Sequence, residues 1–133
     1  MKLLALAVFA LLAAPAFAAD LPAGNCAAPK ANTDLSGCDF TRRSLAGANL
    51  AGAKLTGAKL ESTNLKKANL VGADLRTANA KWANFTGADL TRADLRDADL
   101  FHATFDDAKL EDANLQSAYL FGANLINTRA ARA

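Results

Sequence analysis

A large apolar residue returns at every fifth position between residues 35 and 125. Of these nineteen centres, fifteen are Leu, three are Phe (Phe40, Phe85 and Phe105) and one is Ala80. Two residues before the centre, fifteen of sixteen positions from 48 to 123 are Ala, with Thr63 as the exception. The residue just before the centre is Asp or Asn in twelve of eighteen cases from 39 to 124, and Gly recurs two residues after the centre. The repeating unit is A-[D/N]-L-x-x.

A period of five restricts how this chain can fold. An α-helix repeats every 3.6 residues and a strand alternates every two, so leucines five apart would line one face of neither. The centre and the Ala two residues before it fit the inward pair of a short extended segment, and the remaining positions fit a turn that tolerates Gly, Asn and Asp. Each repeat is then one side of a coil. Ala packed beside Leu or Phe should fill the interior, which predicts no channel for a ligand.

The repeats resemble the motif of pentapeptide repeat proteins. The resemblance covers some ninety residues and is clearest in the runs 48–52 (Ala-Asn-Leu-Ala-Gly), 73–77 (Ala-Asp-Leu-Arg-Thr) and 88–92 (Ala-Asp-Leu-Thr-Arg). It implies an all-β fold, a right-handed quadrilateral β-helix with four repeats in each coil and about 4–5 coils. Residue n should then stack on residue n+20.

The first eighteen residues have the features of a secretory signal peptide. Lys2 supplies a positive charge, residues 3–12 are apolar, and residues 16–18 read Ala-Phe-Ala, the small-x-small pattern of a cleavage site. An apolar run of about ten residues is short for a transmembrane helix, which needs roughly twenty. We therefore expect cleavage after Ala18 rather than a retained anchor, Sec-type export, and a location in the periplasm or outside the cell.

The sequence predicts four segments: a signal peptide (1–18), an N-terminal cap (19–38), the repeat β-helix (39–127) and a C-terminal tail (128–133). The only two cysteines, Cys26 and Cys38, both lie in the cap. Because disulfides persist in oxidising compartments, pairing is the favoured interpretation. Two buried free thiols are the alternative, and with a single His the chain lacks the ligands for a zinc site.

Stacking at intervals of twenty gathers aromatic residues on one side, near the C-terminal end. This aromatic cluster consists of Trp82, Phe101, His102, Tyr119 and Phe121. An outward-facing apolar patch tends to mark an interface, so the aromatic cluster is the candidate interaction patch. The alternative is that Phe101 and Phe121 only stack on each other, or lie beneath the C-terminal tail.

Charged residues are sorted along the chain. Residues 39–85 contain eight basic and three acidic residues, and residues 86–117 contain eight acidic and three basic ones, which gives net charges of +5 and −5. Such a dipole can orient partners, although an ordinary solvated surface is the alternative. The basic half lies away from the aromatic cluster, which argues against nucleic-acid binding. Asp97 and Asp99, like Asp106 and Asp107, do not converge as the six to eight oxygens around calcium must.

Function follows less directly than fold. The nearest serine to His102 in its column, Ser62, lies two rungs or about 10 Å away, so no nucleophile–base pair can be assembled. We predict a non-enzymatic structural or protein-interaction module without cofactor or metal. We expect its partner to be an unknown protein or another copy of the chain, as a homodimer or head-to-tail through the C-terminal coil. We expect no binding to nucleic acid. After cleavage of the signal peptide, we expect no membrane span. The family resemblance implies one alternative, gyrase protection by DNA mimicry, which requires an acidic surface and a cytoplasmic location.

Overall fold

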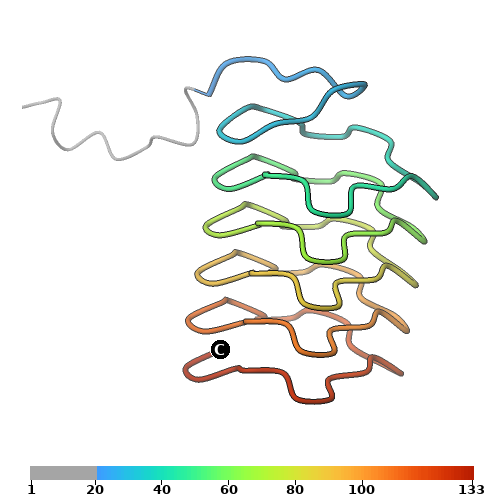
Figure 1. Ribbon diagram of the computed structural model, residues 1–133, viewed down its shortest axis with the longest axis vertical. Coiled ribbons are helices and arrows are strands. Elements are labelled where there is room, and N and C mark those ends of the chain that lie inside the picture. The colour runs from blue at the N-terminus through green and yellow to red at the C-terminus, as the bar shows by residue number, and fades with distance from the viewer. Residues whose placement is uncertain (1–20) are drawn as a thin grey trace, which may run out of the picture.

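The computed structural model describes residues 21–133, so the predicted signal peptide, residues 1–18, lies outside the described residues. The described chain forms a stack of β coils that runs from the N-terminal cap, in blue, to the last coil, in red (Figure 1). The extended segments are short, and they pair through isolated parallel bridges between residues 23 and 129 rather than through long strands. No helix within 21–133 has the length and apolar character needed to cross a membrane.

The register between coils is twenty residues. Sixteen parallel bridges join residue n to residue n+20, from the pair Asp34–Lys54 to the pair Lys109–Arg129. A turn follows every fifth residue along the same stretch, which gives each coil four sides. The predicted stacking of residue n on residue n+20 is therefore confirmed. The bridged residues also include Asp34 and Arg129, which lie just outside the predicted 39–127 segment.

Each side of a coil is hydrogen-bonded to the coils before and after it. The N–H of Leu50 donates to the carbonyl of Asn69 at 2.8 Å, and the N–H of Asn69 donates to the carbonyl of Ala48 at 2.9 Å. The same pattern recurs from one coil to the next, so the backbone polar groups are satisfied without long strands. Neighbouring coils are held at the spacing of paired strands, about 4.8 Å.

The corners explain the polar and glycine positions of the repeat. The N–H of Ala53 donates to the carbonyl of Leu50 at 3.1 Å and closes the turn. The side chain of Asn49 accepts the N–H of Ala51 at 3.2 Å, and Asp or Asn residues at most equivalent positions do the same. This local bond is the reason for Asp and Asn before the centre. The second turn residue, such as Gly52 with φ of 66°, has left-handed backbone geometry, which suits Gly best.

The inward positions make one continuous core. The leucine and phenylalanine centres from 35 to 110 and the alanines beside them, from 53 to 113, are buried. Phe85 and Phe105, twenty residues apart, stack with ring centroids 4.8 Å apart and planes within 1°. The two irregular positions are also accommodated: Ala80 is buried, and the buried hydroxyl of Thr63 donates to the carbonyl of Phe40 at 2.8 Å.

The two ends of the stack differ. At the N-terminal end the cap covers the first coil, and the guanidinium of Arg43 donates to the carbonyls of Cys26 and Ala27 at 2.5 and 3.2 Å. Cys26 and Cys38 lie at disulfide-bonding distance, with their Cα atoms 5.6 Å apart. At the C-terminal end the pairing continues to Arg129, yet Leu125 is 45% exposed because no further coil covers it.

The core can be tested by making the same Leu→Ala substitution at a buried position and at an exposed position. Replacing Leu70, which is fully buried, by Ala should lower the free energy of unfolding by about 2–5 kcal/mol, since it leaves a cavity between coils. Leu125→Ala is the matched control: it removes the same atoms from an exposed side chain and should cost clearly less. Urea unfolding followed by circular dichroism measures both, and equal losses would contradict an open C-terminal end.

The cysteine pair can be tested by reduction. If it is oxidised, the double replacement Cys26→Ser with Cys38→Ser should lower the free energy of unfolding by about 3 kcal/mol, because the crosslink restricts the unfolded chain. Reductant should lower the thermal midpoint of the wild type to that of the double variant and leave the variant unchanged. A wild type that is insensitive to reductant would show two free thiols.

Candidate functional site

The five residues of the aromatic cluster lie close together on adjacent rungs of one side of the stack. Trp82 and His102 occupy the second turn position, with φ of 61° and 54°, and their N–H groups donate to the carbonyls of Phe101 and Phe121 at 2.8 and 2.9 Å. These bonds fix the rungs to which the rings are attached. The left-handed backbone at Trp82 and His102 belongs to the corner geometry, since many non-glycine residues of this fold share it.

The rings form two stacks that meet at right angles. Trp82 lies parallel to His102 with centroids 4.3 Å apart and planes within 5°. Phe101 lies parallel to Tyr119 and Phe121, at 6.1 and 5.9 Å. The edge of one stack faces the other, since the planes of Phe101 and His102 differ by 88°. Stacked and edge-to-face contacts of this kind hold the five rings as one unit.

Much of the aromatic cluster remains open to solvent. Trp82 and Tyr119 are each 53% exposed and Phe121 is 65% exposed, so the C-terminal tail does not cover Phe121. Phe101 and His102 are half-buried among the other rings. An ion pair between Lys81 and Asp99, at 3.3 Å, lies beside the rings on the same side of the coils. The cluster therefore presents an apolar surface with a charged rim, which is the usual composition of a protein contact.

Gly122 is part of this site, next to His102 in the column of residues at intervals of twenty. A Cβ atom at Gly122 would lie 2.6 Å from two ring atoms of His102, so the imidazole occupies the space above the glycine. His102 is thus held between Trp82 and Gly122. In the sequence, Trp82, His102 and Gly122 follow one another in that column.

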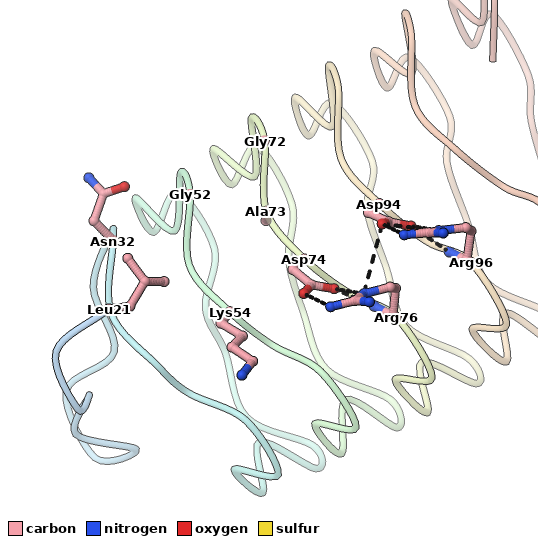
Figure 2. A pocket seen from close by; sticks show the side chains of 10 residues that line it. All are labelled: Leu21, Asn32, Gly52, Lys54, Gly72, Ala73, Asp74, Arg76, Asp94 and Arg96. Carbon is pink, nitrogen blue, oxygen red and sulfur yellow. Dashed lines mark hydrogen bonds and ion pairs between the residues drawn. The ribbon is translucent and has the colours of Figure 1, made fainter. Parts of the chain in front are cut away.

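A groove on another side of the stack was not predicted from the sequence. Its volume is about 600 Å³. Figure 2 shows the side chains that line it, from the cap residues Leu21 and Asn32, past Lys54, to the charged residues of later coils. The repeated run Ala-Asp-Leu-Arg at 73–76 and 93–96, twenty residues apart, was the sequence signal for these charges.

The arginine and aspartate charges in the groove neutralise one another. Arg76 donates to Asp74 through two nitrogens at 2.8 and 2.7 Å, and its Nε lies 3.8 Å from Asp94 of the next coil. Burial would raise the pKa of Asp74, but the hydrogen bonds from Arg76 outweigh burial and lower this pKa. The hydrogen bond from Arg96 likewise lowers the pKa of Asp94. These arginines are therefore engaged by carboxylates and are poorly placed to bind an anion.

Among residues 21–133, no group of three or more His, Cys, Asp or Glu side chains could hold a metal ion. His102 is the only histidine in the chain, and it lies within the aromatic cluster. The aromatic cluster can offer ring faces, ring edges and one imidazole to a partner. It is the site whose chemistry best fits recognition.

Comparisons with known proteins agree with the fold. Residues 44–79 and 81–116 match the family model described as pentapeptide repeats, in eight copies. The interruption falls at Ala80, the one centre without a large side chain. None of the curated proteins matches the chain.

Solved structures similar to this chain include the following three. A pentapeptide repeat protein from the Arabidopsis thaliana thylakoid lumen has a TM-score of 0.67 and 27% identity, and covers 69% of this chain and 64% of its own. QnrB1, a plasmid-mediated fluoroquinolone resistance protein, has a TM-score of 0.51 and 15% identity, with coverage of 68% and 61%. A pentapeptide repeat protein from the cyanobacterium Cyanothece has a TM-score of 0.48 and 32% identity, with coverage of 74% and 60%. The chain spans less than two thirds of the length of each.

The space above Gly122 gives a direct test of the site. Gly122→Ala should displace the ring of His102 and separate it from Trp82, because the new methyl group would overlap the imidazole. The fluorescence of Trp82, the only tryptophan, should change. Gly72→Ala is the matched control: Gly72 has similar positive φ, 66° against 73°, but nothing lies within 4 Å of the added Cβ. The control should lose comparable stability with unchanged fluorescence, and equal spectra for both variants would contradict the arrangement.

Proposed function

Because the chain belongs to the pentapeptide repeat family, we propose that it is a non-enzymatic structural or protein-interaction module whose contact surface is the aromatic cluster. The observation that carries this proposal is the exposure of Trp82, Tyr119 and Phe121, each more than half open to solvent, whereas the Leu and Phe centres from 35 to 110 are buried. Aromatic residues contribute most of the binding energy in many protein interfaces. The rigid stack of coils holds these rings in place before a partner arrives.

Family membership also supports a finer description of the fold. We infer that the coils wind in the right-handed sense of pentapeptide repeat proteins. The bridges with a spacing of twenty run from Asp34 to Arg129, a span that holds nearly five coils of twenty residues. On this ground we propose 4–5 coils.

We further propose that the protein is exported by a Sec-type signal and works in the periplasm or outside the cell. The signal-like residues 1–18 support this location. So does the pairing distance of Cys26 and Cys38, because a disulfide persists in an oxidising compartment. The similar protein from Arabidopsis thaliana comes from the thylakoid lumen.

The proposed partner of the aromatic cluster is another protein. A second mode, homodimer or head-to-tail association through the C-terminal coil, is supported by the exposure of Leu125 and Ile126, 45% and 59%, beside an uncovered coil edge. The basic residues of segment 39–85 lie in earlier coils than most of the rings, which favours protein over nucleic acid as the partner. The proposed role needs no cofactor.

Gyrase protection by DNA mimicry is the less favoured function. The similarity to QnrB1, at 15% identity, shows a shared fold and nothing more. A DNA mimic needs a mostly negative surface, whereas this chain carries 15 Lys and Arg against 13 Asp and Glu. Fractionation distinguishes the two roles, since gyrase protection requires the protein to stay in the cytoplasm.

The contact surface can be tested by substituting charged residues for two of its aromatic residues. Phe101→Asp with Phe121→Asp should abolish crosslinking and pull-down of the partner protein, because two carboxylates replace the apolar surface. Ala51→Asp with Val71→Asp is the matched control, since it places the same two charges at the same turn position, one rung apart, on another side of the coils. The control should keep its partners. Unchanged partners and assembly for the aromatic variant would remove the aromatic cluster from consideration.

A further inference from the structure

One corner of the stack carries charges that nothing in the described chain neutralises. This lysine–aspartate corner consists of the two turn residues that follow centres 45, 65, 85, 105 and 125. In rung order they are Ala46, Gly47, Lys66, Lys67, Thr86, Gly87, Asp106, Asp107, Ile126 and Asn127. The rungs are tied together by backbone bonds, in which Gly47, Lys67, Gly87 and Asp107 each donate to the following rung at 2.8–2.9 Å.

The two lysines and the two aspartates are unpaired. None of the ion pairs between residues 21 and 133 includes Lys66, Lys67, Asp106 or Asp107. Asp106 accepts the backbone N–H of Ile126 at 3.2 Å, a bond that leaves its charge in place. The groove differs in this respect, since its arginines are bonded to aspartates of the same coils. Two positive charges therefore lie one rung before Thr86 and Gly87, and two negative charges lie one rung after.

The three uncharged rungs of the corner differ in the size of their side chains. The middle rung, Thr86 and Gly87, is short and leaves room for the stem of Lys67, whose Cγ lies 3.4 Å from where a Cβ of Gly87 would stand. At one end Ala46 and Gly47 are small and exposed, and nothing lies within 4 Å of a Cβ placed on Gly47. At the other end Ile126 projects into solvent, 59% exposed.

We propose that the lysine–aspartate corner binds a second copy of this chain, side by side and antiparallel, about a two-fold axis at Thr86 and Gly87. That axis exchanges the rungs on either side of the middle. Lys66 and Lys67 of each copy then face Asp106 and Asp107 of the other, and each Ile126 faces the small residues Ala46 and Gly47. The contact is self-complementary, as a two-fold interface must be.

The charges favour this occupant over others. A polyanion is repelled by the aspartates, a polycation is repelled by the lysines, and a parallel copy in register brings like charges together. Only an antiparallel arrangement places every charge opposite its complement. Because the contact runs along one corner and is smaller than a standard interface, the association is weak and sensitive to salt. The inference uses no residue of the aromatic cluster, and it shares only Ile126 with the proposed association through the C-terminal coil.

Two charge-reversal variants and their mixture test the antiparallel pairing. Lys66→Glu with Lys67→Glu makes the corner wholly negative, and Asp106→Lys with Asp107→Lys makes it wholly positive. Sedimentation velocity at several protein concentrations measures self-association, and circular dichroism checks that each variant folds. Lys59→Glu with Arg92→Glu is the matched control for the lysine reversal, since it lowers the net charge by the same amount at exposed positions away from the corner.

We expect the wild type and the control to self-associate at about 0.1 M salt and to dissociate at about 1 M, where the screening length falls from about 10 to 3 Å. Each reversed variant alone should associate about tenfold or more weakly, and their equimolar mixture should recover association as a mixed dimer. A wild type that stays monomeric at every concentration overturns the proposal. So do reversed variants that associate like the wild type, or a mixture that stays monomeric. Loss of aromatic-cluster partners in the separate test would leave this result untouched.

Discussion

The whole molecule depends on one hydrogen-bond register, in which every coil contains twenty residues. The N–H of Leu50 donates to the carbonyl of Asn69, nineteen positions further along the chain, and the same separation recurs at each side of each coil. A side with one residue more or fewer would shift every later rung and leave buried backbone groups unpaired, at a cost of about 1–3 kcal/mol for each group. The uninterrupted five-residue period is the sequence form of that constraint.

The same register explains why the surface consists of columns. Apart from Thr33, Cys38 and Thr63, the buried inward positions hold Ala, Leu or Phe because the interior is narrow, so most variation falls on the residue before the centre and the two turn residues. Residues twenty apart at those positions are neighbours at about 4.8 Å, close enough for rings to stack and charges to pair. Arg76 between Asp74 and Asp94, and Trp82 on His102, are two results of this spacing.

Both proposed contact surfaces border the side whose centres are 45, 65, 85, 105 and 125. Trp82 lies at the corner before Phe85, and Thr86 and Gly87 lie at the corner after it. Between the corners, the positions before these centres hold only short uncharged residues: Ser44, Asn64, Asn84, Thr104 and Asn124. One side of the rod therefore presents aromatic rings along one edge and alternating charge along the other. The short side chains between the corners leave both edges accessible, which suits the proposed contact role.

The sequence by itself determined the period, the inward pair of each repeat, the Asp or Asn that bonds its own turn, and, through the family resemblance, the columns that gather the five aromatic residues. It did so because those features depend on positions within one repeat or at a fixed spacing. Tertiary structure alone decided that the His102 ring fills the space above Gly122, that Arg76 reaches Asp94, and that pairing continues to Arg129 while Leu125 stays exposed. Side-chain orientation and end coverage depend on what the adjacent coil offers, and a five-residue pattern does not contain that information.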